Sequence, residues 1–252
     1  MRGYTLVELA IVMLVIGLLV AGFLRGKELL SGGQVTAAIT AQDDLRKAIM
    51  VFRNNYYAYP GDLMTPDTTL NNCDGVICSR SGNGNGIIGV AIDNPTPMSS
   101  IFKGTSTFPD TENSSAWAQL AAAEILHKTV PEPTSIDAGQ SHPAAAGGGV
   151  YHVLYNATGL GIKIGTAEPA RSGHYLMQAA SAQVDGNNYA DNAVWLSHVM
   201  ERLDKKIDDG MPFTGNVLGF GQDVGALCAT GPGASALYSQ SGQCNALFRI
   251  TD

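Results

Sequence analysis

The longest apolar stretch of the chain lies close to its first residue. Leu9–Leu24 carries no charge and is almost wholly apolar. A helix rises ~1.5 Å per residue, so residues 4–24 would measure roughly 30 Å, about the thickness of the hydrocarbon layer of a bilayer. The pattern therefore predicts a membrane-spanning helix over residues 4–30. Glu8 lies inside this segment, and a carboxylate at bilayer depth costs roughly 3 kcal/mol unless it has a partner.

A second helical pattern follows directly, from Lys27 to about Asn55. Its apolar positions recur at steps of three and four residues, as on one face of a helix. The stripe consists of Val35, Ala38, Ile39, Gln42, Leu45, Ile49 and Phe52. No proline or polar linker separates it from the apolar stretch, so we expect one long helix whose second half packs on a folded domain. A membrane helix followed by a separate soluble helix is the alternative.

The rest of the chain predicts a mixed domain of helices and strands. A helix is expected from Ser114 or Ser115, as its N-cap, to Lys128, and another over Asn187–Ile207, with Gly210 as its C-cap. Strand composition marks four segments and a shorter fifth, separated by turns: residues 151–156, 175–181, 213–220, 246–250 and 162–164. We therefore expect an α+β fold in which residues 31–252 form a head, with an antiparallel sheet packed on the long helix.

Composition and charge exclude several function classes. The 252 residues are 45% hydrophobic and 15% charged, with a formal net charge of −7. This acidic balance, without a basic patch, argues against nucleic-acid binding. Thirty glycines and eleven prolines among few charged residues indicate a loop-rich extracytoplasmic domain. The five histidines show no ligand spacing and no catalytic motif is present, so we expect neither an enzyme nor catalytic residues.

The cysteines fall into two local pairs, Cys73 with Cys78 and Cys228 with Cys244. A domain outside the cytoplasm would oxidise them, and four cysteines allow three connectivities, of which the two local bonds are favoured. Zinc sites use short paired spacings supported by histidine, which these separations do not fit. We expect disulfides in the head.

Two further groups of polar residues are candidate cation ligands. Asn83 and Asn85 alternate with glycines, as ligands do in a calcium loop, but the closing glutamate is missing. An Asn-Gly turn is the alternative, and we expect no obligatory cofactor, with calcium as the one candidate. Asp208 and Asp209 are adjacent and point different ways, which favours a role in the turn that ends the preceding helix.

The first residues carry a family resemblance. Gly3-Tyr4-Thr5-Leu6-Val7-Glu8 resembles the processing site of type IV prepilins. In that family a prepilin peptidase cuts after the glycine, and the new N-terminal residue is N-methylated. A glutamate four residues further along pairs with the N-terminal ammonium of a neighbouring subunit. The resemblance implies that residues 1–3 are a leader, that Tyr4 is the mature N-terminus, and that Glu8 and Tyr4 act in assembly. Many members also have a helix-kinking proline, where this chain has Gly22 and Arg25.

A second, looser resemblance extends into the head. Some pilin-like proteins follow the long helix with an aromatic-Pro-Gly-Asp segment, a Gly-Asn-Gly loop and a tryptophan-containing helix. Here these are Tyr59–Asp62, Ser81–Ile87 and Ser114–Leu120. The Lys-Ile-Asp-Asp-Gly-x-Pro ending at residues 206–212 also occurs in that subset. A C-terminal disulfide loop such as Cys228–Cys244 is similar to the variable surface loop of many type IV pilins.

The resemblance implies a structural subunit of a type IV pilus or pilus-like filament. The expected partners are prepilin peptidase, an inner-membrane assembly platform, lipid before assembly, and other copies of the chain in a helical filament. Before assembly the protein would be a single-pass bacterial inner-membrane protein with a periplasmic head. Afterwards it would lie in an extracellular pilus or a periplasm-spanning filament. The alternatives are a pseudopilin of a type II secretion system, or a minor pilin whose head is an adhesin or a DNA-uptake module.

Overall fold

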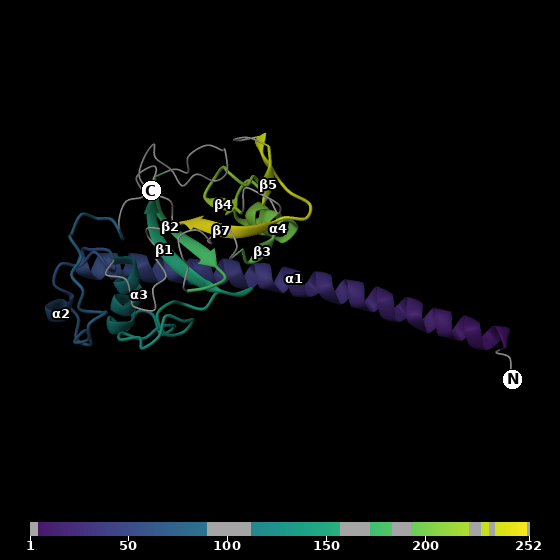
Figure 1. Ribbon diagram of the computed structural model, residues 1–252, viewed down its shortest axis with the longest axis horizontal. Coiled ribbons are helices and arrows are strands. Elements are labelled where there is room, and N and C mark those ends of the chain that lie inside the picture. The colour runs from purple at the N-terminus through teal and green to yellow at the C-terminus, as the bar shows by residue number, and fades with distance from the viewer. Residues whose placement is uncertain are drawn as a thin grey trace.

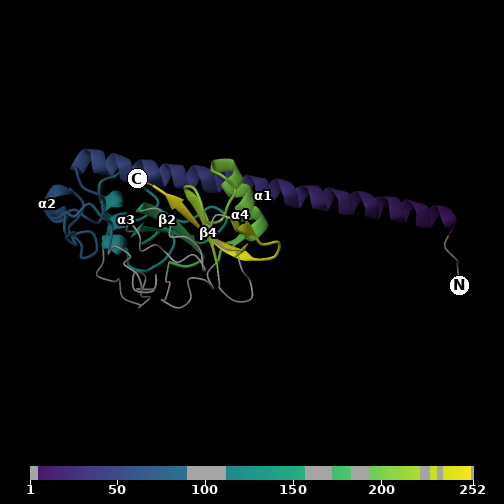
Figure 2. The same cartoon turned by 90° about the horizontal axis from the view of Figure 1, so that it is seen from above.

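The spine of the protein is one unbroken helix. The structure is a computed structural model that describes residues 5–89, 112–156, 172–182, 193–221, 228–231 and 235–250. Helix α1, Leu6–Tyr56, has 51 residues, which corresponds to roughly 75 Å at ~1.5 Å per residue. Figures 1 and 2 show that its first half projects and its second half lies along the rest of the protein. The prediction of one long helix rather than two is confirmed.

The head is built on an antiparallel sheet. Its order is β1-β2-β7-β3, with β4 also paired to β7, and every pairing is antiparallel. A separate hairpin joins β5 to β6. The strands are β1 Val150–Asn156, β2 Gly173–Ala179, β3 Trp195–Leu196, β4 Val217–Phe220, β5 Ala229–Thr230, β6 Leu237–Tyr238 and β7 Gln243–Arg249. The four longer strands overlap predicted segments, but β4 begins four residues after the predicted start at 213 and β7 three residues before the predicted start at 246. The expected strand at 162–164 lies outside the described residues.

Three shorter helices complete the described head: α2 Pro66–Thr69, α3 Glu112–Ala122 and α4 Ser197–Ile207. The predicted extent of α3 is wrong at both ends. Ser114 and Ser115 lie buried inside the helix rather than capping it. The helix stops six residues before Lys128, because the chain reverses at Glu124, whose φ is 57°.

The predicted start of α4 is also wrong. The helix begins at Ser197, because Trp195 belongs to β3 and pairs with Cys244 of β7. The Trp195 indole also donates a hydrogen bond to Gln178, which holds this residue against the sheet. Residues 183–192 of the predicted helix lie outside the described part of the chain. At the other end the C-cap is Asp208, and Gly210, with a φ of 76°, forms the turn beyond it.

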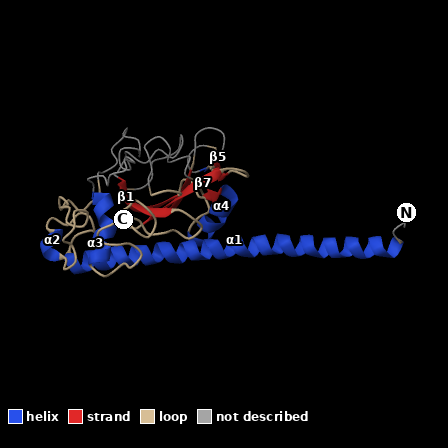
Figure 3. Ribbon diagram, turned by 60° about the horizontal axis from the view of Figure 1, so that its bottom comes forward, coloured by secondary structure: helices blue, strands red, loops and turns tan. Residues whose placement is uncertain are grey.

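The second half of α1 packs on one face of the sheet and forms the core with it. The predicted stripe is buried at Val35, Ala38, Leu45, Ile49 and Phe52. Opposite it lie Trp117 of α3 and Tyr151 of β1, both fully buried. Burying a large apolar side chain stabilises a fold by about 2–3 kcal/mol. The fold class is therefore α+β, with a helix and a sheet sharing one core (Figure 3).

Candidate functional site

The projecting half of α1 exposes an apolar surface all round. Its large apolar side chains, from Leu6 to Leu24, are between 47% and 84% exposed. An 18-residue window of this helix has a mean hydropathy of 2.7, and none of it is buried in the protein. A helix that is apolar on every side has to be covered by lipid or by other protein. By length and composition, this is a helix that could cross a membrane.

The tip of this helix is closed by a reciprocal cap. The Glu8 carboxylate accepts hydrogen bonds from the Thr5 backbone N–H and the Thr5 hydroxyl, both at 3.0 Å. In return the Glu8 N–H donates to the Thr5 hydroxyl at 3.3 Å. This is a capping box, which satisfies donors at the helix start that have no partner within the helix. The capping box can be read from the sequence, because Thr5 lies three residues before Glu8. Gly3 and Tyr4 lie outside the described residues.

The asparagines proposed for calcium form local turns. Asn83 Oδ1 accepts from the N–H of Asn85 at 3.0 Å. Asn85 Oδ1 accepts from the N–H of Ile87 at 2.9 Å. These are Asx turns, in which the side-chain oxygen replaces a backbone carbonyl. Both candidate ligand oxygens therefore already have a hydrogen-bond donor.

Two carboxylates hold the same loop from either side. Asp62 accepts from the backbone N–H groups of Asn85 and Gly86, at 3.1 and 2.8 Å. Glu112 accepts from those of Asn83 and Gly89, at 3.0 and 2.8 Å. Backbone amides thus balance the two negative charges, and a cation at this loop would have to compete with them. Burial raises the pKa of Glu112. The arrangement is that of a structural loop clamp.

Sequence reasoning missed this clamp. The loop is held by Asp62, after α1, and by Glu112, the first residue of α3. Glu112 stands far from the loop in the sequence, and neither periodicity nor spacing links the two.

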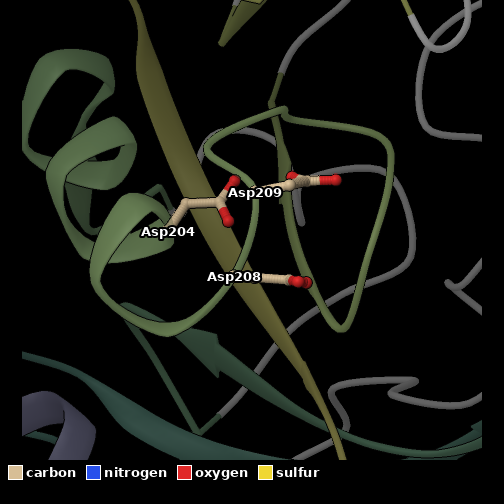
Figure 4. Close-up of side chains that lie close together, drawn as sticks. All are labelled: Asp204, Asp208 and Asp209. Atoms are coloured by element: carbon tan, nitrogen blue, oxygen red, sulfur yellow. The ribbon is translucent and has the colours of Figure 1, made fainter.

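A second acidic group lies where α4 ends (Figure 4). Asp204, Asp208 and Asp209 each offer a carboxylate oxygen, and these oxygens lie within 4.8 Å of one another. Asp204 is fully buried and accepts from the Tyr238 hydroxyl at 2.8 Å and from the Gly210 N–H at 3.3 Å. Burial is the main cause that raises the pKa of Asp204 to about 7. The two hydrogen bonds lower this pKa, and the negative charges of Asp209 and Asp208 raise it.

The other two carboxylates of this group organise the following turn. Asp208 accepts from the N–H groups of Asn216 and Val217. Asp209 accepts from the Met211 N–H at 2.8 Å and from the Thr214 hydroxyl at 2.5 Å. The expectation that Asp208 and Asp209 point different ways is wrong, because their carboxylate oxygens lie within 4.8 Å of each other. All three acids nevertheless have protein donors, and the geometry supports the expected turn role of Asp208 and Asp209. Sequence reasoning missed Asp204, although it lies only four residues before Asp208, the C-cap of the same helix.

Both predicted disulfides are present. Cys73 is bonded to Cys78 and Cys228 to Cys244, with Cα–Cα distances of 5.2 and 4.9 Å. The second bond ties the residue before β5 to the middle of the sheet, because Cys244 belongs to β7. It therefore attaches the small β5–β6 hairpin to the main sheet.

A tyrosine-lined cavity lies where α1 ends. Its volume is about 520 Å³, and its lining includes Tyr56, Tyr57, Tyr59 and Tyr155, together with Arg53. Tyr57 is 93% exposed and has a left-handed backbone, with a φ of 56°. This conformation ends α1, because Tyr57 is its C-cap and donates its backbone N–H to the Arg53 carbonyl. It costs a bulky residue about 1 kcal/mol relative to glycine, and the exposed tyrosine ring is not needed for the cap.

No family model, no curated protein and no solved structure matches this chain in comparisons with known proteins. We therefore infer the function from the geometry of the chain. The projecting apolar helix with Glu8 at its tip is the most unusual surface of the described residues. The two acidic groups and the asparagine loop hold the head together, and the tyrosine-lined cavity is a separate candidate for ligand binding.

Proposed function

We propose that this chain is a type IV pilin-like subunit, which assembles into a filament through the apolar half of α1. The observation that carries the proposal is a fully exposed apolar helix that continues without a break into the spine of an α+β head. Such a helix lies stably in lipid and equally well among other copies of itself. Assembly then exchanges lipid contacts for helix packing.

Glu8 supplies the specific contact in this proposal. Cleavage after Gly3 leaves a positively charged N-terminus at Tyr4. In the assembled filament this ammonium pairs with Glu8 of a neighbouring copy, so that neither charge is left unpaired in an apolar core. Before assembly, the capping box with Thr5 gives the carboxylate two local donors.

The capping box allows a sharp test, because the cap and the charge can be removed separately. Glu8→Gln keeps a side chain that completes a capping box but removes the charge. We expect it to abolish or strongly reduce filament formation, measured by electron microscopy and by the amount of sheared filament. Thr5→Ala is the matched control, since it breaks the cap and keeps the charge, and filaments should still form. Normal assembly of Glu8→Gln would contradict the charge pairing.

The processing step is tested by the intact mass and N-terminal sequence of protein from the native envelope. The proposal expects a chain that starts at N-methylated Tyr4. A start beyond Ala21 would remove the apolar helix and refute the proposal. Abundant protein in sheared surface fibres would identify a pilus subunit, whereas trace amounts in the envelope would identify a pseudopilin or a minor pilin.

The tyrosine-lined cavity favours a second candidate, a head that binds a ligand while the filament carries it. The exposed ring of Tyr57, in a cavity that Arg53 also lines, is suited to stacking on a sugar ring or on a nucleic-acid base. The net charge of −7 disfavours nucleic acid and leaves a glycan as the better fit. Binding of the full chain to a glycan array, compared with Tyr57→Ala, tests this candidate. Equal binding by both proteins, or no binding by either, would exclude the cavity as a glycan-binding site.

A further inference from the structure

A basic groove lies between α1 and α4, just beyond the apolar segment. Three cationic side chains line it: Arg25 of α1, and Arg202 and Lys206 of α4. No carboxylate is among the described residues that line it. The expectation of a chain without a basic patch is therefore wrong at this place. The patch was hidden in the sequence because α4 follows Arg25 by more than 170 residues.

The two α4 cations are held over the groove by neutral groups. Arg202 Nη1 donates to the Ser31 hydroxyl at 3.3 Å. Lys206 Nζ donates to the Thr36 hydroxyl at 3.2 Å. Neither contact neutralises a charge. The neighbouring Lys205 differs, because it forms an ion pair with Glu201 at 2.6 Å. The groove thus concentrates positive charge on a chain whose net charge is −7.

Part of the floor of the groove, which α1 forms, is bare backbone. It contains Gly32 and Gly33, and a Cβ added at either would meet no atom within 4 Å. A glycine inside a helix costs roughly 0.5–1 kcal/mol relative to alanine. Packing within the single chain does not explain this cost. Two glycines below three cations leave room for a group from outside the chain to approach the helix.

The groove lies where the apolar helix would leave a membrane. Arg25 is the first charged residue after the apolar Leu9–Leu24 run. Figures 1 and 3 show α4 and β5 at the end of the head nearest the projecting half of α1. Two large apolar side chains are exposed on elements of this end, Leu196 at 49% and Leu237 at 59%. Exposed apolar residues beside cations are typical of a surface that rests on a membrane interface.

We propose that this groove binds the phosphate of an anionic phospholipid in the leaflet from which α1 emerges. Arg202 and Lys206 contact the phosphate oxygens, and the bare glycines leave space for the headgroup. The head thereby docks on the membrane surface before assembly. The inference rests on the membrane insertion of α1 in the proposed function, but it does not require processing or filament formation.

The test uses the full chain in vesicles of phosphatidylcholine with increasing phosphatidylglycerol. Native mass spectrometry counts the phosphatidylglycerol molecules retained on the protein. Each cation at an anionic surface contributes about 1 kcal/mol, so Arg202→Gln with Lys206→Gln should raise the half-saturating phosphatidylglycerol fraction roughly tenfold or more. The matched control, Arg46→Gln with Lys205→Gln, removes one cation from each helix outside the groove and should bind as the natural chain does.

A second variant separates the groove from general electrostatic attraction. Gly33→Leu keeps every charge but fills the floor, and its Cβ meets no atom within 4 Å, so the head should fold. We expect it to lose phosphatidylglycerol retention to a similar degree. Equal retention by the natural chain, the charge variant and Gly33→Leu would overturn the proposal. Unchanged lipid retention with a loss of contacts between copies would overturn it in favour of a second copy as the occupant.

If the natural chain forms no filaments but retains phosphatidylglycerol in vesicles, the proposed function is refuted and the lipid site stands. If the natural chain forms filaments but the groove variants retain as much lipid as it does, the lipid site is refuted and the proposed function stands. Because retention is measured in vesicles without peptidase or assembly factors, the two results are independent.

Discussion

Asp204 makes the stability of the head depend on pH in an unusual direction. Its carboxyl group is fully buried, and burial raises its pKa from a usual 3.8 to about 7. Between these values the folded state keeps the proton while the unfolded chain has lost it. Stability therefore falls as pH rises through this range, because the folded state binds more protons than the unfolded state.

The magnitude follows from the size of the shift. A difference of about 3 pKa units corresponds to about 4 kcal/mol at roughly 1.4 kcal/mol per unit. The contribution is fully present below the unfolded pKa and fully lost above pH 7. Asp204→Asn cannot titrate, and its amide oxygen can still accept the hydrogen bond from Tyr238. Its stability relative to the natural chain should therefore rise by about 3–4 kcal/mol between pH 4 and pH 8.

The assay is urea unfolding of the full chain in detergent micelles, with both disulfides intact. Fluorescence of Trp117 and Trp195, which are both buried, reports on the head. Subtracting the two proteins at each pH cancels titrations that they share. Tyr238→Phe removes a hydrogen bond that favours the ionised form of Asp204, so it should move the loss of stability to higher pH. A difference between Asp204→Asn and the natural chain that stays within about 1 kcal/mol at every pH would refute this reasoning.

Three further predictions concern single residues of the head. Burial lowers the pKa of His152 to about 4 from 6.5, so the stability of the natural chain relative to His152→Gln should fall by about 3 kcal/mol between pH 6.5 and pH 4. Phe52→Ala removes a fully buried ring of α1 and should cost about 3–5 kcal/mol in urea unfolding. Gly61→Ala should cost about 2–3 kcal/mol, because Gly61 has a φ of 90° and a Cβ there would lie 2.3 Å from the Glu112 carbonyl oxygen.

Each of these predictions has its own control. A parallel pH profile for His152→Gln and the natural chain would show that this histidine is accessible to protons when folded. Val51→Ala, an exposed neighbour of Phe52, should change stability by less than about 0.5 kcal/mol, and equal costs at both positions would contradict the assigned core. Gly33→Ala is the control for Gly61, since α1 has open space there and alanine should be neutral or stabilising.

The long helix and the main strands were predictable because their signals are local. The stripe from Val35 to Phe52 repeats with the helical period, and that period alone indicates which side is buried. The two disulfides were also predictable, because the two cysteines of each pair lie close together in the sequence. The apolar first half of α1 needed no more than its composition and length.

Features set by distant contacts could not be predicted. Trp195 reads as helical in its local sequence, but pairing with Cys244 and the hydrogen bond to Gln178 place it in a strand. Glu112, the first residue of α3, contacts the asparagine loop, and Arg202 lies next to α1 only in the folded chain. In each case tertiary contacts override or supplement a local preference.

The central position of β7 bears on the timing of folding. This strand is the last of the described strands along the chain, yet it pairs with three earlier strands, β2, β3 and β4. The sheet therefore cannot close until residues 243–249 have been synthesised. By then the N-terminal segment has long been available for membrane insertion. In the proposed function the head crosses the membrane, so a factor that shields its unpaired strands would have to act before β7 arrives.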